Sequence, residues 1–285
     1  RWDEALACDP EFLYINDWNE WTAGKYQPDG EGKTVSWLRR QSPFYFVDQY
    51  NAEFNRCIHP VKGGYTDNYY MQMAQNLRRY KGARPIPRLE GYVEAKADGD
   101  FGEWDAVTTE YRDTRGDVFH RDAKGYAGLH YVDTSGRNDI LTAKVAVGRR
   151  AIGFYAETAD ALTPSDGNNW MLLLIDADND SSTGWYGYDF VINKKVKDGR
   201  TTTLMRYDSD SEQWIEAAEL PYRYEGNRLE VIVPRKLLGL TGDGFTFDFK
   251  WSDNAYELED PISFCLHGDT APNRRFNYRC IWNRR

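Results

Sequence analysis

The stretch "WMLLLIDADNDSSTGWYGYDFVIN" (residues 170–193) decides the fold class. It opens with an unbroken apolar run, passes through a turn rich in Asp, Asn, Ser and Gly, and ends in a second apolar segment, "YDFVIN". A short apolar run bounded by turn residues is typical of a buried strand, because a helix needs a longer periodic segment. The stretch therefore predicts two strands joined by an acidic turn.

Short segments of the same kind occur on both sides of this stretch, from residue 89 onward. Many of them alternate apolar and polar residues or are rich in β-branched residues, and Gly, Asn and Asp separate them. Examples are "LEGYVEAKA", "ILTAKVAV", "AIGFYAET", "TTTLMRYD", "RLEVIVP" and "FTFDFKWSDN". About ten short strands at close spacing predict a mainly β fold, a two-sheet β-sandwich over residues 89–285. Within it, only "PRKLLGL" (234–240) resembles a helix.

The first 85 residues have a different pattern. The prolines of "KGARPIPR" (81–88) end a helix and favour an extended connector, which predicts two domains, 1–85 and 89–285. Before the prolines, "DNYYMQMAQNLRRYKG" (67–82) predicts a helix, "PFYFVDQYNAEFNRCI" (43–58) is a second amphipathic stretch, and "EFLYI" (11–15) predicts a buried strand. One strand and two helices cannot bury a sheet edge alone. This region therefore indicates the end of a larger α/β domain.

Composition narrows the classes of partner. The net charge of −9 argues against nucleic acid, and no apolar run approaches the roughly 20 residues that span a membrane. Aromatic residues make up 15% of the chain. Since aromatic rings stack on the C–H faces of sugars and carboxylates bond their hydroxyls, this composition favours a glycan-handling protein. An aromatic-filled sandwich core is the alternative.

Two further features of the sequence concern secretion and the state of the cysteines. The opening "RWDEALACDP" lacks the basic and then apolar pattern of a signal peptide. The cysteines, Cys8, Cys57, Cys265 and Cys280, show no C-x-x-C spacing, which argues against structural zinc and leaves their disulfide state open.

The acidic turn "DADNDSSTG" is a candidate cation site. It places Asp176, Asp178 and Asp180 at alternate positions, and hard oxygen ligands at this spacing suit Ca²⁺. Ser181 and Gly187 stand where an EF-hand has its Gly and Glu, so the turn is not an EF-hand. The alternative is an Asp/Asn/Ser turn satisfied by its own backbone.

Four aromatic residues beside this turn are candidates for an exposed sugar-binding platform. They are Trp170, Trp185, Tyr186 and Tyr188. Two other tryptophans are expected to be structural: Trp104 in "EWD" would close an edge of the sandwich, and Trp251, which alternates with phenylalanines, would lie in the core.

The segment "FLYINDWNEWTAG" (12–24) resembles the last barrel strand of glycoside hydrolase families 71 and 99, in which Asn-Glu-Trp follows the strand and a second glutamate comes three residues after the first. In family 99, the first glutamate assists through the substrate 2-hydroxyl and the second acts as general acid/base. The resemblance implies that Glu20 is the first of these, whereas Ala23 stands in place of the second. Glycoside hydrolysis normally uses two carboxyl groups. Glu20 is therefore a catalytic residue, a sugar contact or a structural carboxylate, and we expect no turnover from this chain alone.

The order of motifs in the β-rich part resembles the family 9 carbohydrate-binding module and the related DOMON-type sandwiches. "GDFGEWDAV" (99–107) precedes the first strands, an Asp-rich turn follows a central apolar strand, and "FKWSDN" (249–254) comes near the end. This resemblance implies glycan binding by a module of a secreted, periplasmic or cell-surface glycoside hydrolase, with the sandwich packed against the rest of a larger hydrolase chain. A catalytically active hydrolase that uses Glu20, and a structural sandwich that binds nothing, are the alternatives.

Overall fold

The computed structural model describes residues 2–16, 25–26, 34–35, 40–41, 45–46, 58–60, 67–82, 85–118, 121–124, 130–167, 169–253, 261, 263–274 and 276–284. The chain divides into two compact units, Arg1–Pro85 and Ile86–Arg285. No helix within the described ranges is long and apolar enough to cross a membrane.

The described part of the first unit contains two helices and four very short strands. These are α1 (Trp2–Ala7), β1 (Lys25–Tyr26), β2 (Thr34–Val35), β3 (Arg40–Gln41), β4 (Tyr45–Phe46) and α2 (Asn68–Lys81). The helix predicted over 67–82 is confirmed as α2. It ends before Gly82, whose backbone has a positive φ of 77°. Arg79 on α2 donates to Asp3 on α1 at 2.8 Å, so an ion pair joins the two helices.

The buried strand predicted at 11–15 is wrong. Residues 12–16 have no regular secondary structure, and the side chains of Phe12 and Tyr14 are 77% and 74% exposed. The described part of this unit offers only two-residue ladders, β1 with β4 and β2 with β3, which this segment does not join. The end of a (β/α)₈ barrel is therefore not confirmed. Glu20 and Ala23 lie outside the described residues.

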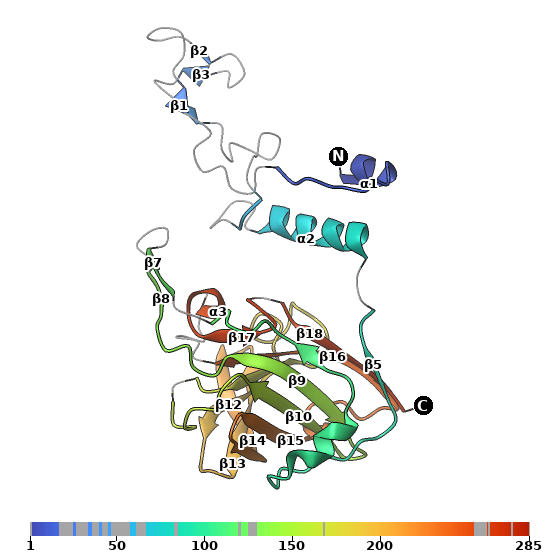
Figure 1. The fold of residues 1–285 in the computed structure, drawn as a ribbon. Helices are drawn as coiled ribbons and strands as arrows, with labels where there is room; N and C mark the ends of the chain where they lie inside the picture. Colours follow the sequence, from blue (N-terminus) through green and yellow to red (C-terminus); the bar gives the residue numbers. More distant parts are fainter. Residues whose placement is uncertain are drawn as a thin grey trace. The chain divides into compact units, whose positions relative to one another are not determined.

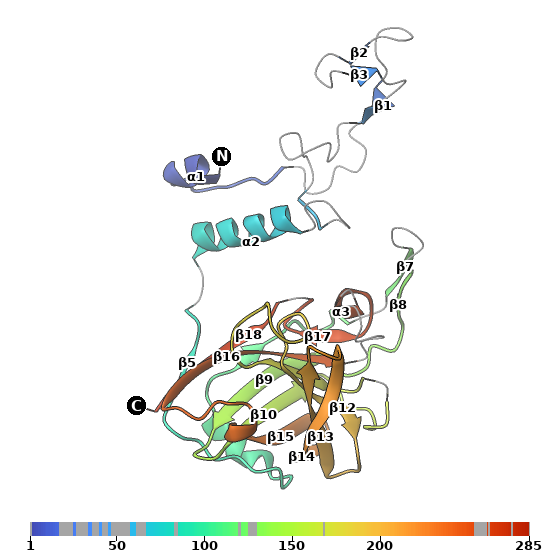
Figure 2. The same ribbon diagram turned by 180° about the vertical axis from the view of Figure 1, so that it is seen from behind.

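The second unit is mainly β, as predicted, and its strands form two layers. The layers are shown from opposite sides in Figures 1 and 2, where the green strands β9 and β10 belong to one layer and the red strands β16 and β18 to the other. The first layer follows the order β5 (Arg88–Glu90), β18 (Tyr278–Asn283), β16 (Gly244–Asp253), β11 (Leu172–Asp176), β12 (Phe190–Val196), β13 (Thr201–Asp208) and β14 (Gln213–Glu225), with β17 (Asp269–Ala271) also paired to β16. The second follows the order β14, β15 (Arg228–Pro234), β10 (Ala151–Thr158), β9 (Ile140–Val147) and β6 (Tyr111–Arg112).

Strand β14 connects the two layers. Its first part pairs with β13 over residues 213–221, and its last residues, 222–225, pair with β15. Among the described residues of this unit, the ladders are antiparallel except that of β5 with β18. A separate hairpin, β7 (Arg121–Lys124) with β8 (His130–Asp133), and the short helices η1 (Phe101–Ala106), η3 (Arg235–Leu237) and α3 (Ser263–Leu266) complete the described unit. The single turn η3 replaces the helix predicted over 234–240, because Gly239 follows it with φ of 73°.

The apolar run of β11 is unbroken because both faces of this strand are covered. Leu173 and Ile175 point into the main core between the layers. Leu172 and Leu174 point to the opposite face, into a second group of buried side chains that we call the outer cluster: Leu172, Leu174, Trp185, Tyr188, Val191 and Phe264. A strand that is buried on both faces needs apolar residues at successive positions, whereas a half-exposed strand alternates.

Both tryptophans that were expected to be structural are confirmed. Trp251 is fully buried in the main core. Trp104, on η1, is buried in a smaller cluster with Tyr155, and its indole N–H donates to the buried carboxylate of Glu230 at 2.9 Å. This bond ties η1 to β15, which lies between β14 and β10, and Trp104 packs with Ala146 and Tyr155 on the outer face of the second layer. The structural role of Trp104 is therefore confirmed, whereas its expected place at an edge of the sandwich is wrong.

Candidate functional site

The acidic turn between β11 and β12 folds back tightly on itself. Asn179, Gly184, Tyr186 and Gly187 all have positive φ angles. A Cβ at Gly184 would lie 2.3 Å from the carbonyl oxygen of Tyr188, so only glycine fits there. The N–H of Trp185 donates to that carbonyl at 2.8 Å, which closes the turn.

This folding brings three carboxylates together. Asp176, Asp178 and Asp189 each place an oxygen within 4.8 Å of the others. Asp180, the third predicted ligand, lies outside this group: its Oδ1 accepts from the backbone N–H and the hydroxyl of Ser182, at 2.9 and 2.6 Å. Asp180 thus stabilises its own turn, which was the alternative considered for the whole motif.

Burial shapes the electrostatics of the group. It raises the pKa of Asp176 to about 6, although the N–H of Asn179 opposes the shift, and the nearby charge of Asp189 raises it further. Burial also raises the pKa of Asp189. Carboxylates that repel one another in this way are stabilised by a cation between them, and oxygen ligands suit a hard ion such as Ca²⁺.

The expectation of an exposed aromatic platform is wrong for three of the four residues. Trp170 and Trp185 are 1% and 6% exposed, and Tyr188 is also buried. Trp170 packs in the main core, where its indole N–H donates to the Thr163 carbonyl, and the Tyr188 hydroxyl donates to Asn277 at 2.6 Å. Trp170 is buried between the two layers, and Trp185 and Tyr188 are buried in the outer cluster on the opposite face of the sheet. Tyr186 is 67% exposed and remains available to a ligand.

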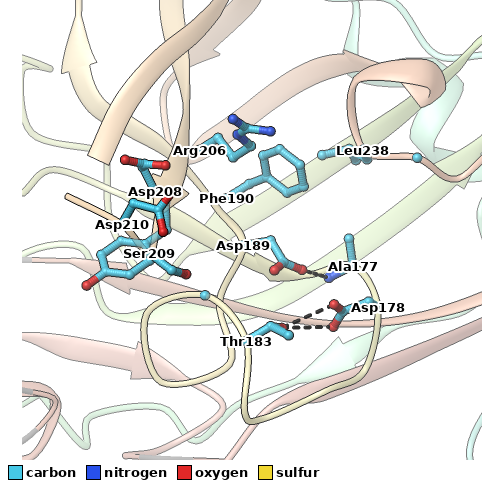
Figure 3. Close-up of a pocket in the computed structure, with 13 residues that line it drawn as sticks. Ala177, Asp178, Thr183, Asp189, Phe190, Arg206, Asp208, Ser209, Asp210 and Leu238 are labelled. Carbon is cyan, nitrogen blue, oxygen red and sulfur yellow. Dashed lines mark hydrogen bonds between the residues drawn. The ribbon is translucent and has the colours of Figure 1, made fainter. Parts of the chain in front are cut away.

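A hollow of about 530 Å³ lies beside the acidic turn (Figure 3). Three segments line it: the turn with the start of β12, the end of β13 with the residues that follow it, and the chain after η3. The lining residues are Ala177, Asp178, Thr183, Gly184, Asp189, Phe190, Arg206, Tyr207, Asp208, Ser209, Asp210, Leu238 and Gly239.

The hollow combines apolar surface with hydrogen-bonding groups. Phe190, Tyr207 and Leu238 supply the apolar part, and carboxylates, hydroxyls and a guanidinium supply the polar part. Hydrogen bonds hold the polar walls in place: Thr183 Oγ1 donates to Asp178 at 3.1 Å, and the N–H of Ala177 donates to Asp189 at 2.8 Å. Such a surface suits a small polar ligand that also has apolar faces.

Sequence reasoning missed two parts of this site. Asp189 stands directly before an apolar strand, and only the folding back of the turn brings it next to Asp176. The sequence predicts a strand that ends in "RYD" (206–208), as observed in β13, but its pattern does not indicate that this strand end and the following Ser209 and Asp210 line a hollow. The other candidate, Glu20, lies outside the part of the chain that the structure describes.

A second acidic group lies elsewhere in the sandwich. Asp113, Asp117 and Asp269 each have an oxygen within 4.8 Å of the others. Burial, reinforced by the charge of Asp117, raises the pKa of Asp113 to about 7, and burial also raises the pKa of Asp269. Asn273 donates to Asp113 at 3.2 Å.

This group predicts a pH-dependent stability. The pKa of Asp113 is near 3.8 in the unfolded chain and about 7 in the folded protein. At pH values between these two, Asp113 binds more protons in the folded than in the unfolded state. The free energy of unfolding therefore increases as pH falls through 7. Thermal melts in EDTA should show a melting temperature at least about 3 °C higher at pH 5 than at pH 8, the shift that roughly 1 kcal/mol gives in a domain of this size. Asp113→Asn should be more stable than the wild type at pH 8 and less pH-dependent. A wild-type melting temperature that is constant or falls toward pH 5 would contradict this expectation.

Comparisons with known proteins add a structural likeness. No protein-family model matches the chain, and no curated protein matches it. Two solved structures of a family 9 carbohydrate-binding module from Caldicellulosiruptor kristjanssonii are similar to it. The complex with cellotriose has a TM-score of 0.35 at 11% identity and covers 70% of this chain and 95% of the module. The complex with glucose has a TM-score of 0.36 at 12% identity and covers 70% and 97%. Likeness at this level assigns no ligand to the chain.

Proposed function

We propose that the sandwich is a carbohydrate-binding module and that the hollow beside the acidic turn holds the sugar. The observation that carries this proposal is the lining of the hollow, which places apolar side chains and hydrogen-bonding groups around one space of about 530 Å³. That volume falls in the range of roughly 300–1,000 Å³ typical of small-molecule sites.

Sugar chemistry fits both parts of the lining. Carboxylates such as Asp189 and Asp208 accept hydrogen bonds from sugar hydroxyls, and the Arg206 guanidinium donates to ring and hydroxyl oxygens. The partly buried Tyr207 ring offers apolar surface to sugar C–H groups, whereas the Phe190 ring lies mostly in the main core and borders the hollow with only its small exposed part. Tyr186, two residues beyond Gly184 in the chain, adds an exposed aromatic ring to the same turn.

The same turn supports the proposal of a bound Ca²⁺, with Asp189 in place of Asp180. Since binding to the folded state alone stabilises a protein, Ca²⁺ at 100 times its dissociation constant should add about 2.7 kcal/mol to the free energy of unfolding. Thermal melts with Ca²⁺ and with EDTA measure this effect. Asp189→Asn should abolish the increase, whereas the control Asp180→Asn should keep it. An increase that persists in Asp189→Asn, or is missing from the wild type, would rule out this cation site.

The wider setting is proposed from the resemblance of "FLYINDWNEWTAG" to the barrel end of glycoside hydrolases. In this proposal the module is part of a secreted, periplasmic or cell-surface hydrolase, and the sandwich packs against the rest of that chain. The absence of a glutamate at Ala23 favours binding over catalysis as the role of this chain.

Isothermal titration of the full chain with a panel of neutral oligosaccharides, including β-1,4-glucan and xylan oligomers, tests the function. We expect at least one of them to bind in the micromolar to millimolar range. Arg206→Ala should weaken that binding by at least about tenfold, because a charge-assisted hydrogen bond contributes roughly 1.5–3 kcal/mol. The matched control Arg284→Ala removes an exposed arginine that pairs with Asp243 and should bind like the wild type. If no oligosaccharide binds, the sandwich is the structural scaffold of the alternative reading.

A further inference from the structure

The lining of the hollow has more negatively than positively charged side chains. Its lining includes four carboxylates, from Asp178, Asp189, Asp208 and Asp210, and Arg206 is the only basic side chain among the described residues that line it. The whole chain also has a net charge of −9, so it adds to the negative potential. A ligand that enters the hollow therefore meets an excess of negative charge.

The carboxylates are distributed around the space. Asp178 and Asp189 come from the acidic turn and the residue before β12, whereas Asp208 and Asp210 come from the end of β13 and the residues that follow it. Figure 3 shows the two pairs on different sides of the hollow, with Arg206 next to the Phe190 ring. A cationic group between the pairs can interact with both.

The hydrogen bonds of these carboxylates do not cancel their charge. Asp178 accepts from the Thr183 hydroxyl, Asp189 from the backbone N–H of Ala177, and Asp208 from the hydroxyl of Ser211. All three donors are neutral groups. Each carboxylate also keeps unused acceptor positions, because its two oxygens can accept about four hydrogen bonds.

We propose that the hollow selects glycans with free, protonated amino groups over neutral glycans and disfavours those with uronic acids. This inference rests on the carbohydrate-binding function proposed above and names the class of sugar. An ammonium group gains charge-assisted hydrogen bonds from the carboxylates, a hydroxyl at the same position gains only neutral ones, and a uronate meets like charge. Because these charges are near the surface, added salt weakens the selection.

Calcium acts against this selection. An ion held by Asp176, Asp178 and Asp189 would neutralise the carboxylates on one side of the hollow, which leaves only Asp208 and Asp210 beside Arg206 at the end of β13. The preference for amino sugars is therefore expected to be largest in EDTA and smaller with Ca²⁺ present.

The test is a titration of the full chain at pH 5.5 in low salt and EDTA with four matched hexaoses. The ligands are β-1,4-linked glucosamine, β-1,4-linked glucose, β-1,4-linked N-acetylglucosamine and α-1,4-linked galacturonate; tetralysine serves as a cation without a sugar. At this pH a primary amine is protonated. We expect the glucosamine hexaose to bind about tenfold more tightly than the two neutral hexaoses, and the galacturonate hexaose to bind more weakly than either. In 0.5 M NaCl the tenfold difference should fall to about twofold or less.

A pair of variants identifies the carboxylates responsible. The double variant Asp208→Asn/Asp210→Asn should bind the glucosamine hexaose no more than about twofold more tightly than the glucose hexaose. Its affinity for both hexaoses should fall, because Asp208 is one of the acceptors proposed for sugar hydroxyls. The control Asp243→Asn changes an exposed carboxylate outside the hollow and should keep the full preference. Thermal melts of both variants establish that they fold.

The outcomes separate this inference from the function on which it rests. If no hexaose binds, the carbohydrate function fails and the inference with it. If the glucose hexaose binds at least as tightly as the glucosamine hexaose, or if the preference persists in the double variant, only the inference is overturned. If tetralysine binds as tightly as the glucosamine hexaose, the hollow attracts cations without recognising a sugar, and the inference is likewise overturned.

Discussion

Asp253→Ala is expected to lower the free energy of unfolding by about 3–5 kcal/mol, the usual cost of removing one partner of a buried ion pair. The carboxylate of Asp253, at the end of β16, is completely buried. It accepts from the Arg137 guanidinium at 2.8 Å and from the backbone N–H of Met171 at 2.9 Å. Alanine removes the charge that balances Arg137 and the acceptor that holds Met171 before β11.

Equilibrium unfolding in urea measures this effect. Asp253→Asn keeps an acceptor for Met171 and should cost less than alanine. The control Asp243→Ala removes a carboxylate whose pair with Arg284 is exposed, and it should change the free energy of unfolding by no more than about 0.5 kcal/mol. A loss below about 1 kcal/mol for Asp253→Ala would show that the ion pair does not hold these segments together.

Trp185→Ala is expected to cost about 3–5 kcal/mol, the range for a buried aromatic side chain. Trp185 lies in the outer cluster, where its ring centroid is 6.2 Å from that of Trp214 and 6.0 Å from that of Phe264. The truncation leaves a cavity between the acidic turn and the sheet. Because Trp185 is buried, its loss should reduce stability whether or not sugar is present.

The neighbouring residue gives the matched comparison. Tyr186→Ala removes a ring that is exposed and contacts Trp185 edge to face at 5.3 Å, so it should alter stability by no more than about 0.5 kcal/mol. Urea unfolding of the two variants would separate a structural tryptophan from an exposed tyrosine. Similar losses for both would contradict the burial pattern described above.

Local pattern was sufficient for the elements whose environment the sequence encodes directly. The run "MLLLID" indicated a buried strand, the spacing of apolar residues over 67–82 indicated α2, and the alternation of Trp251 with phenylalanines placed it in the core. In each of these three cases, the residues that pack against the element affect only how well it packs and do not decide which structure it adopts.

The errors occurred where distant segments decide the outcome. Trp170 and Trp185 flank an acidic turn, but their exposure depends on the second layer and on residues as distant in sequence as Phe264. The carboxylate of Asp189 reaches Asp176 only because Tyr186 and Gly187 adopt positive φ angles that reverse the chain. The apolar "EFLYI" segment suggested a strand, but a strand also needs a neighbouring sheet.

The most direct measurement of the central claim is amide chemical-shift mapping with the tightest-binding oligosaccharide from the titrations. We expect the perturbed amides to cluster in three segments that line the hollow, residues 177–190, 206–210 and 238–239. The hairpin of β7 and β8 should be unaffected. Perturbations that are absent at saturating sugar, or that concentrate on that hairpin and spare the three segments, would contradict carbohydrate binding in the hollow.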